Sequence, residues 1–422
     1  MRRVPRVTAM ALLTRTPRDR RRHSRGAAAF RVLLTEWRLT EDGAARSSLR
    51  LVVRWQEAGA CVRLFVLTRG SSDLPLPPGV VPLYPTRKPR HLRHVIVQAG
   101  LRLLRQAHSA DVVVAGRELG FGMLASWLAA RVVGAPFVVI IRSEPLAAIE
   151  SYVAPRWQAA NRRALAAADA VICISSGLAP AAEAAGVAPA RVHVVLNGVE
   201  TGRVLRSGAG SAAGLPAGEG PLVVGVGRVE HQKGFDLLVR AHARLVEEGR
   251  PHRLLVLGDG RDRPELERLA TELGVRESVH LPGFTPEPLP VLAAADLFCL
   301  PSRWEGFGQS LAEALVLGRP TIAADCVSGP RELLADGRHG DLVPVDDVEA
   351  LTAAIRRHLD DPRRLQEAAR LGQEWVMRHL DVDRTAAEML DILATVEPRG
   401  WRARRGLGRR RGPRHRVADS RR

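Results

Sequence analysis

Two carboxylates flank a glycine-containing loop near residue 305, and their spacing suits a grip on an extended ligand. Glu305 and Glu313 are separated by seven residues, and Gly306, Phe307 and Gly308 follow the first of them. A loop of this kind between a strand and a helix lets backbone N–H groups approach an anion at the helix N-terminus. Because loop residues separate the two glutamates, we predict that they hold different parts of one ligand rather than act as a general acid and base.

A second loop supplies cations. Segment 227–234 begins with Gly227, contains Arg228 and Lys233, and opens a predicted helix. Only two of the 63 basic residues are lysines, so a lysine retained here suits a site that needs a compact ammonium group. Backbone amides, a helix N-terminus and two cations suit a diphosphate. An ordinary strand-to-helix turn with solvated cations is the alternative.

Two more loops follow predicted strands in the same half of the chain. Residues 257–260 form a tight Gly-Asp-Gly turn, whose glycines we interpret as serving the turn alone, and residues 282–285 include Gly283 and Phe284. All four loops are expected along one edge of a sheet. A ligand with a base, a ribose, a diphosphate and a sugar would need that many contacts.

Apolar runs and amphipathic segments alternate along most of the chain. In the first half, strand-like runs lie at 31–35, 61–67, 80–83, 111–115, 136–141, 170–174 and 192–196, with helical patterns at 45–57, 92–107, 121–133, 156–167 and 178–185. In the second half, strand-like runs lie at 222–226, 252–257, 279–281, 296–300, 321–324 and 341–343, with helical patterns at 235–248, 263–273, 289–294, 309–317, 330–334, 348–359, 364–379 and 384–393. Such alternation predicts an α/β protein with parallel sheets, in two Rossmann-like domains that face each other across a ligand-binding cleft.

The composition changes at the domain boundaries. Residues 201–220 are rich in glycine, alanine and serine, which is typical of a linker between a first domain at 30–200 and a second at 221–397. Residues 1–29 carry nine arginines and one aspartate, and residues 398–422 carry eleven arginines and one aspartate, so the net charge of +18 resides in the two ends. We expect these basic ends to be disordered. Functionless extension and attraction to anionic lipid both remain open.

Several classes of protein are disfavoured by what the sequence lacks. The four widely spaced cysteines, Cys61, Cys173, Cys299 and Cys326, predict buried free thiols in a reducing compartment. No stretch reaches the ~20 apolar residues of a membrane span. No dinucleotide fingerprint, Walker A loop, zinc spacing or Gly-x-Ser-x-Gly turn occurs. We therefore expect a cytoplasmic protein, with a peripheral position on the inner face of the cell membrane left open.

The loop motifs occur together in the order found in one family. Gly-Arg-x4-Lys-Gly at 227–234, the turn at 258–260, Leu-Pro-Gly-Phe at 281–284 and the glutamate pair resemble the retaining glycosyltransferases of family 4, which have the GT-B fold. The resemblance spans residues 30–395 and is densest over 221–335. Residues 197–200 are similar to the segment before the family's linker. Residues 328–332 resemble a subgroup that adds hexoses or hexosamines to lipid-linked glycans.

The resemblance implies donor-site roles for the matching residues. Arg228 and Lys233 would hold the diphosphate of a nucleotide-diphosphate sugar and stabilise its departure. Glu305 would hold sugar hydroxyls, and Glu313 would bind the ribose. Further donor contacts are expected from Gly227, Gly283, Phe284, Gly306, Phe307 and Gly308. The family needs no metal or cofactor, and we favour UDP over GDP as the nucleotide. A front-side mechanism is favoured over one with Glu305 as the nucleophile.

The acceptor side carries weaker signals. Gly43 ends a loop, 36–43, that lacks the glycine pair usual in the family, and Arg142 follows a strand where many members have a histidine. Both are taken as acceptor-side candidates in an acceptor domain. The segment 86–105 is a basic, partly amphipathic helix, which suits either a membrane surface or a crossover helix with a solvated face.

Three functions fit these features to different degrees. The first is transfer of a sugar to a glycan or polyprenol-linked glycan in cell envelope polysaccharide synthesis. The second is the same chemistry on a soluble sugar or metabolite. The third is nucleic-acid binding through the arginine-rich ends, against which the neutral charge of residues 30–397 argues.

Overall fold

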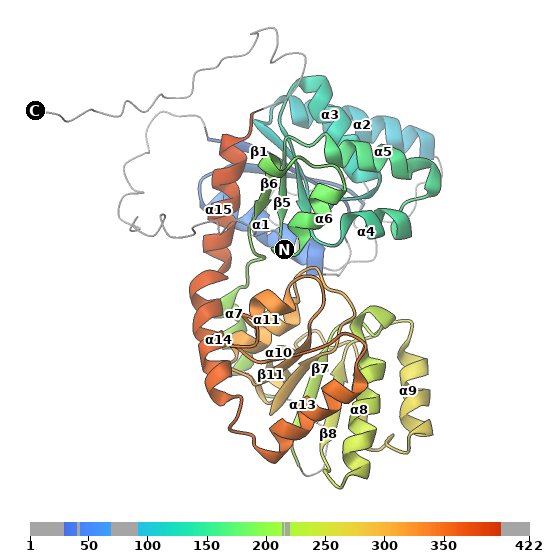
Figure 1. Cartoon of the computed structure of the whole chain (residues 1–422). Coiled ribbons are helices and arrows are strands. Elements are labelled where there is room, and N and C mark those ends of the chain that lie inside the picture. The colour runs from blue at the N-terminus through green and yellow to red at the C-terminus, as the bar shows by residue number, and fades with distance from the viewer. Residues whose placement is uncertain (1–28, 40–42, 69–91, 213–214, 216–219, 398–422) are drawn as a thin grey trace, which may run out of the picture.

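The chain folds into two α/β domains, one above the other, in the computed structural model shown in Figure 1. The structure describes residues 29–39, 43–68, 92–212, 215 and 220–397. The expected strand at 80–83 and nearly all of the two basic ends lie outside these residues. Of the basic segment 86–105, backbone is described from residue 92 and side chains from residue 98.

The first domain contains a six-stranded parallel sheet with strand order β2-β1-β3-β4-β5-β6. Its strands are β1 (Arg31–Arg38), β2 (Cys61–Thr68), β3 (Val112–Ala115), β4 (Phe137–Ile141), β5 (Ala170–Cys173) and β6 (Val192–Val194). Its helices are α1 (Gly43–Glu57), α2 (Leu92–His108), α3 (Gly120–Val133), α4 (Pro145–Tyr152), α5 (Pro155–Ala166) and α6 (Leu178–Ala184). Val32 of β1 pairs with both Val62 and Val112, which sets the register of the central strands.

The second domain repeats this plan with strand order β12-β11-β10-β7-β8-β9. Its strands are β7 (Leu222–Val226), β8 (Arg253–Leu257), β9 (Val279–Gly283), β10 (Leu297–Leu300), β11 (Thr321–Ala324) and β12 (Asp341–Val343). Its helices are α8 (Phe235–Glu247), α9 (Arg263–Glu272), α10 (Leu289–Ala293), α11 (Gln309–Val316), α12 (Pro330–Leu333), α13 (Val348–Asp360) and α14 (Gln366–His379). The predicted pair of Rossmann-like domains with parallel sheets is confirmed.

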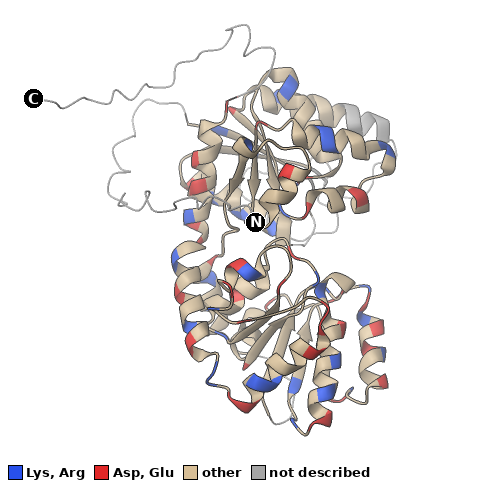
Figure 2. Ribbon diagram, in the orientation of Figure 1, with Lys and Arg blue, Asp and Glu red and all other residues tan. Residues whose placement is uncertain are grey.

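The central strands form the cores because helices cover both faces of each sheet. Every residue of β3, β4, β5, β10 and β11 is buried. Strands buried on both faces are expected to be continuously apolar, as these are in the sequence. Figure 2 shows both signs of charge on the helices of both domains, while the strands are mostly uncharged. Among the described residues, no helix is long and apolar enough to cross a membrane.

The chain crosses between the domains twice, and the two crossing segments lie next to each other. The first passes through Val199, and the second through Leu380, whose carbonyl oxygen accepts a hydrogen bond from the Val199 amide at 2.7 Å. Helix α15 (Val382–Thr395) then packs on α1, where the Trp55 indole donates to the carbonyl oxygen of Ala386 at 2.9 Å. Figure 1 shows α14 against the second domain and α15 against the first. The two helical patterns at 364–379 and 384–393 are predicted from the sequence to pack back and close the fold, and the structure confirms this.

Three local expectations differ from the structure. Residues 201–208, which we expected to belong to an irregular linker, form helix α7 (Thr201–Gly208), because buried Val204 packs this helix onto the second domain beside α10 and α11. Strand β1 continues through residues 36–38, which we expected in a loop. Helix α4 was not predicted. Its Glu144 N-cap accepts from the Leu146 amide at 3.3 Å, and Pro145 occupies the first turn, a start signal visible in the sequence.

Candidate active site

A crevice is expected where the second sheet reverses its strand order. After β7 the chain continues to β8 on one side, and after β10 it continues to β11 on the other. The loops that follow β7 and β10 therefore diverge at their carboxyl ends, which is where open α/β sheets bind ligands. These are the two loops, 227–234 and 301–308, that the sequence marked for chemistry.

Lys233 and Glu305 meet at this point. The Lys233 Nζ lies 2.5 Å from Glu305 Oε1, and the Ser302 hydroxyl donates to the same oxygen at 2.7 Å. The two side chains are only 14% and 7% exposed. The Ser328 hydroxyl donates to the backbone carbonyl oxygen of Glu305 at 2.5 Å, which ties the loop to the start of α12. The structure thus brings together two predicted catalytic residues that are 72 positions apart.

Arg303 fastens the two loops together. Its guanidinium donates to both carboxylate oxygens of Asp236 at 2.8 Å and to the carbonyl oxygen of His231 at 2.8 Å. It also donates to Asp346 at 2.6 Å. The hydrogen bond to Asp236 is the main cause of a raised Arg303 pKa. Since this cation is fully engaged by protein groups, its role is to hold the loops.

Glycines allow the loop backbones to approach each other. A Cβ on Gly258 would lie 1.9 Å from the Gly227 carbonyl oxygen, and a Cβ on Gly260 would lie 2.2 Å from that of Val229. Our interpretation that the Gly-Asp-Gly glycines serve only their turn was therefore wrong, because they also admit the neighbouring loop. Gly234 has φ of +64°, and its Cβ would overlap the carbonyl oxygen of Pro301 at 2.1 Å.

Helix α11 begins without a side-chain cap. Its N-cap, Gly308, has φ of +87°, and the first helical hydrogen bond runs from the Ala312 amide to the Gly308 carbonyl oxygen at 3.0 Å. The amides of residues 309–311 precede that bond and have no partner within the helix. Phe307 is buried and anchors the loop in the core. An uncapped N-terminus with an anchored loop provides the donors that an anion requires.

Glu313 lies one turn further along α11. Burial raises its pKa, and a hydrogen bond from Gln309 Nε2 at 3.3 Å opposes that shift. Arg50, Arg203 and Arg46 also favour the ionised form from α1 and α7. Glu313 is thus separated from Glu305 by the helix start, as the sequence predicted for two grips on one ligand.

The other predicted donor residues lie on neighbouring loops. The Arg228 side chain is 55% exposed, pairs with Glu230 at 3.1 Å and donates to Gln232 Oε1 at 3.2 Å, so it does not join the Lys233–Glu305 pair. Gly283 ends β9 with φ of +91°, and its carbonyl oxygen accepts from the Gly258 amide at 3.0 Å. Phe284 follows with 58% of its surface exposed.

On the first-domain side, Arg142 is turned inward. Its Nε donates to the Gly116 carbonyl oxygen at 2.8 Å, and its Nη2 donates to the Ser48 hydroxyl at 3.1 Å. Ser48 in turn donates to buried Glu36 at 2.5 Å. Burial lowers the pKa of Arg142 to about 10, and the Glu36 carboxylate opposes that shift. The guanidinium that we expected to face an acceptor instead satisfies buried groups of its own domain.

The backbone of Arg142 nevertheless reaches the loop after β10. A Cβ on Gly306 would lie 1.8 Å from the Arg142 carbonyl oxygen, so the loops after β4 and β10 touch across the domain boundary. Gly43, the other acceptor-side candidate, begins α1 and is exposed. The loop before it, residues 40–42, lies outside the described residues.

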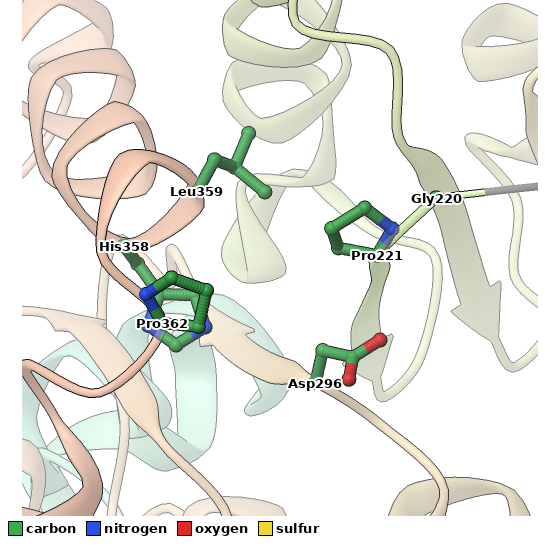
Figure 3. Close-up of a pocket in the computed structure, with 6 residues that line it drawn as sticks. All are labelled: Gly220, Pro221, Asp296, His358, Leu359 and Pro362. Atoms are coloured by element: carbon green, nitrogen blue, oxygen red, sulfur yellow. The ribbon is translucent and has the colours of Figure 1, made fainter.

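A cavity of about 300 Å³ lies elsewhere in the second domain (Figure 3). It is lined by Gly220, Pro221, Asp296, His358, Leu359 and Pro362. Pro221 and Asp296 precede β7 and β10, so the cavity opens at the amino ends of the strands whose carboxyl ends carry the candidate site. It therefore takes no part in that site.

Sequence reasoning missed several residues that shape the site. These are Asp236, Gln309, Ser302, Arg303 and Ser328, whose contacts hold the loops or the two glutamates. Ser302 is the second residue after β10, a position that favours a site residue in a parallel sheet. Gln309 lies one helical turn before Glu313, a spacing that the sequence does show. Asp236, Arg303 and Ser328 carry no local signal, because their partners lie on other loops.

Comparison with known proteins identifies the family. The family described as glycosyl transferases group 1 matches residues 211–375, and a glycosyl transferase 4-like domain matches residues 42–198. The chain is 30% identical over 280 residues to a 2-deoxystreptamine glucosyltransferase of Streptomyces kanamyceticus. This match covers 63% of this chain and 72% of that protein. It is also 30% identical over 227 residues to LpsE of Rhizobium meliloti, a lipopolysaccharide core biosynthesis glycosyltransferase, which covers 54% and 64% respectively.

A solved structure shares the whole architecture. HepE of Anabaena, crystallised in complex with UDP, superposes with a TM-score of 0.70 and 19% identity, covering 87% of this chain and all of that one. Both halves of the chain match glycosyltransferase family models, and the two sheets match those of HepE. The chain therefore belongs to the group 1 glycosyltransferases, a family of enzymes, and has the GT-B fold.

Proposed function

We propose that this chain moves a hexose or an N-acetylhexosamine from a nucleotide-diphosphate sugar to a hydroxyl group of a glycan or lipid-linked glycan, with retention of anomeric configuration and without a metal ion. The observation that carries the proposal is the Lys233–Glu305 pair beside the uncapped start of α11. A partly buried ammonium group and free helix amides suit a diphosphate, which carries negative charge when it leaves.

The chemistry follows from where that charge develops. The bond between the anomeric carbon and the β-phosphate oxygen breaks, and its electron pair stays on that oxygen. Lys233, the amides of residues 309–311 and the exposed Arg228 stabilise the departing diphosphate. The acceptor oxygen forms its new bond on the same face, and its proton passes to the leaving phosphate. No protein nucleophile is needed, and Glu305, held by Lys233 and Ser302, orients sugar hydroxyls.

The nucleotide is proposed to be UDP rather than GDP. HepE, which has the same fold, was crystallised with UDP. In this chain the ribose would meet Glu313, and the base would lie near Gly283 and the exposed ring of Phe284.

The acceptor is proposed to be membrane-associated, at the inner face of the cell membrane. LpsE is named for lipopolysaccharide core synthesis, whereas the Streptomyces relative is named for 2-deoxystreptamine, so a soluble acceptor is the second candidate. Leu128 and Val132, one turn apart on α3, are 60% and 54% exposed, and Leu101 of the adjoining α2 is 52% exposed. Apolar side chains near Arg131 and Arg102 suit a lipid interface.

A transfer assay tests the proposed chemistry. The purified chain is screened against UDP- and GDP-linked hexoses and N-acetylhexosamines by thermal shift, and the best donor is then offered to lipid-linked and soluble acceptors with EDTA present. We expect one UDP-sugar to raise the melting temperature and the product to keep the donor's anomeric configuration by NMR. Inverted product, activity that needs added Mg²⁺, or no response to any nucleotide sugar would contradict the proposal.

Binding to vesicles separates the two acceptor classes. We expect the chain to sediment with vesicles containing anionic lipid, and the double variant L128S/V132S to sediment less. A chain that stays in the supernatant and glycosylates only soluble acceptors favours the second candidate.

A further inference from the structure

A row of hydrogen bonds runs from the first domain to Glu313 of the second. The Ser47 hydroxyl donates to Asn197 Oδ1 at 2.8 Å, and Asn197 Nδ2 donates to Gln309 Oε1 at 2.9 Å. Gln309 Nε2 then donates to Glu313 Oε1 at 3.3 Å. Ser47 lies on α1, and the Asn197 amide is bonded to the Ile174 carbonyl oxygen at the end of β5, so both residues are anchored in the first domain.

The row has one direction, because each carboxamide uses its oxygen on one side and its nitrogen on the other. The Ser47 proton places the Asn197 oxygen toward α1, which leaves the Asn197 nitrogen for Gln309. The Gln309 oxygen is thereby engaged, which turns the Gln309 nitrogen toward Glu313. Ser47 and Asn197 are buried, at 4% and 7% exposure, so water cannot easily replace these bonds.

The carboxylate at the end of the row depends on such support. Burial raises the pKa of Glu313, and the Gln309 hydrogen bond is the first influence that opposes it. Arg50 and Arg46 on α1 and Arg203 on α7 also face it. Arg50 and Arg203 are shared with Glu200 at 4.0 and 3.3 Å. Gln309 holds Oε1, and among the described residues no hydrogen bond to Oε2 occurs, which suits a ligand hydroxyl there.

We infer that Ser47 and Asn197 of the first domain act through Gln309 as positioning residues for Glu313, so that nucleotide affinity in the second domain depends on the first. The inference rests on the proposed function in that Glu313 is taken to bind the ribose. It differs from the roles implied by the resemblance, in which the donor contacts belong to the second domain. It also ties the donor site to domain closure, because the Asn197–Gln309 bond crosses the domain boundary.

The variant Gln309→Glu tests the direction of the row. Its carboxylate can still accept from Asn197 but cannot donate to Glu313, so two carboxylates face each other and their pKa values rise. We expect the dissociation constant for UDP, measured by calorimetry, to rise about tenfold at pH 8. The defect should shrink as the pH falls to 5.5, where a shared proton restores a donor. The wild-type protein should show no comparable recovery over this range.

Two further variants probe the first-domain residues. In Asn197→Asp, the new carboxylate can only accept, so the Gln309 carboxamide turns its nitrogen toward it. The Gln309 oxygen then faces Glu313, and UDP affinity should fall by about tenfold at pH 8. In Ser47→Ala, the Asn197 carboxamide loses the hydrogen bond that orients it, and UDP affinity is expected to fall roughly two- to threefold. Gln373→Glu serves as a matched control, because Gln373 donates to the Val316 carbonyl oxygen at 2.7 Å at the other end of α11. Any UDP defect in that control should not depend on pH.

The outcomes separate this inference from the proposed function. If Glu313→Gln weakens UDP binding while Gln309→Glu and Asn197→Asp bind within twofold of wild type, the row is irrelevant and the inference fails alone. A Gln309→Glu defect of equal size at every pH also overturns it, since a purely structural fault would behave that way. If wild type binds neither UDP nor GDP, or Glu313→Gln binds as wild type does, the proposed donor site fails and the inference with it.

Discussion

At the carboxyl ends of β7 and β10, the second domain brings together Lys233, Glu305 and the uncapped start of α11. At the corresponding ends of β1 and β3, the first domain turns Glu36 inward to Ser48. The Arg142 side chain, which comes from the end of β4, bonds there to Ser48 and to the Gly116 carbonyl oxygen. Both sheets reverse their strand order at these places. Topology therefore offers two equivalent sites, and the side chains make only one of them ready for an anion.

The difference lies in how each charge is satisfied. Arg228 keeps 55% of its side chain exposed, whereas Arg142 is 9% exposed as a residue and bonds through Nε and Nη2 to its own domain. A buried guanidinium must be matched within the protein, so it is not available to a ligand without a large desolvation loss. In the first domain the backbone carbonyl of Arg142, rather than its side chain, lies against Gly306 of the second domain.

The largest expected effect breaks the second-domain site. The substitution Lys233→Gln removes the ammonium group that we propose faces the departing diphosphate, and we expect kcat to fall about 10²- to 10³-fold. The melting temperature should change little, because the carboxamide that replaces the ammonium group can still donate to Glu305. Steady-state kinetics with the preferred nucleotide sugar and a thermal melt check both parts. Turnover within threefold of wild type would contradict the diphosphate role.

The same type of substitution in both domains sharpens the comparison. Arg142→Met leaves Glu36 buried with fewer partners, and we expect the free energy of unfolding to fall by about 3 kcal/mol. Arg228→Met removes an exposed cation, and its free energy of unfolding should stay within about 0.5 kcal/mol of wild type while turnover drops. Urea denaturation and kinetics on both variants give the test. Equal stability losses would show that the first-domain cluster is not structural.

A smaller effect concerns buried histidines behind the second-domain site. His242 Nδ1 lies 2.8 Å from His252 Nε2, and its Nε2 lies 2.8 Å from the Ser278 hydroxyl. Burial lowers the pKa of His242 to about 3. Unfolded histidine titrates near 6.5, so below that pH the unfolded state binds more protons and stability declines.

We therefore expect the free energy of unfolding to be about 1.4 kcal/mol lower at pH 5.5 than at pH 7.5 through His242. The free energy of unfolding has its full value above pH 6.5. It decreases as the pH falls from 6.5 toward 3, because the unfolded state then binds a proton that His242 in the folded state does not. Denaturation curves at both pH values measure it, and His242→Gln should show a shallower dependence. An identical dependence in the variant would assign the effect to other groups.

The fold was predictable because apolar periodicity reports burial directly. Strands β7, β11 and β12 have the expected bounds, since each is a short apolar run ended by a turn residue. Helix α7 was not predicted, because its glycines and serines lower local helix propensity, and packing of Val204 and Gly208 on the second domain outweighs them.

The site was predictable in its loops but not in its contacts. Glu305 and Lys233 were assigned to one ligand, yet nothing local indicates that they pair directly. Arg142 was expected to face an acceptor, because its position after β4 is the right one. Its direction depends on Glu36 and Ser48, which come from segments about 100 residues earlier.

The sequence alone determined which residues stand at the carboxyl ends of the second-domain strands. Strand ends, glycines and helix starts are local features, and a parallel sheet brings them to one edge. Only the tertiary structure decided which of these groups stay open to a ligand and which are consumed within the protein. That choice depends on partners from distant segments, such as Ser47 and Asn197 behind Gln309, because burial forces each polar group to find a partner wherever the fold supplies one.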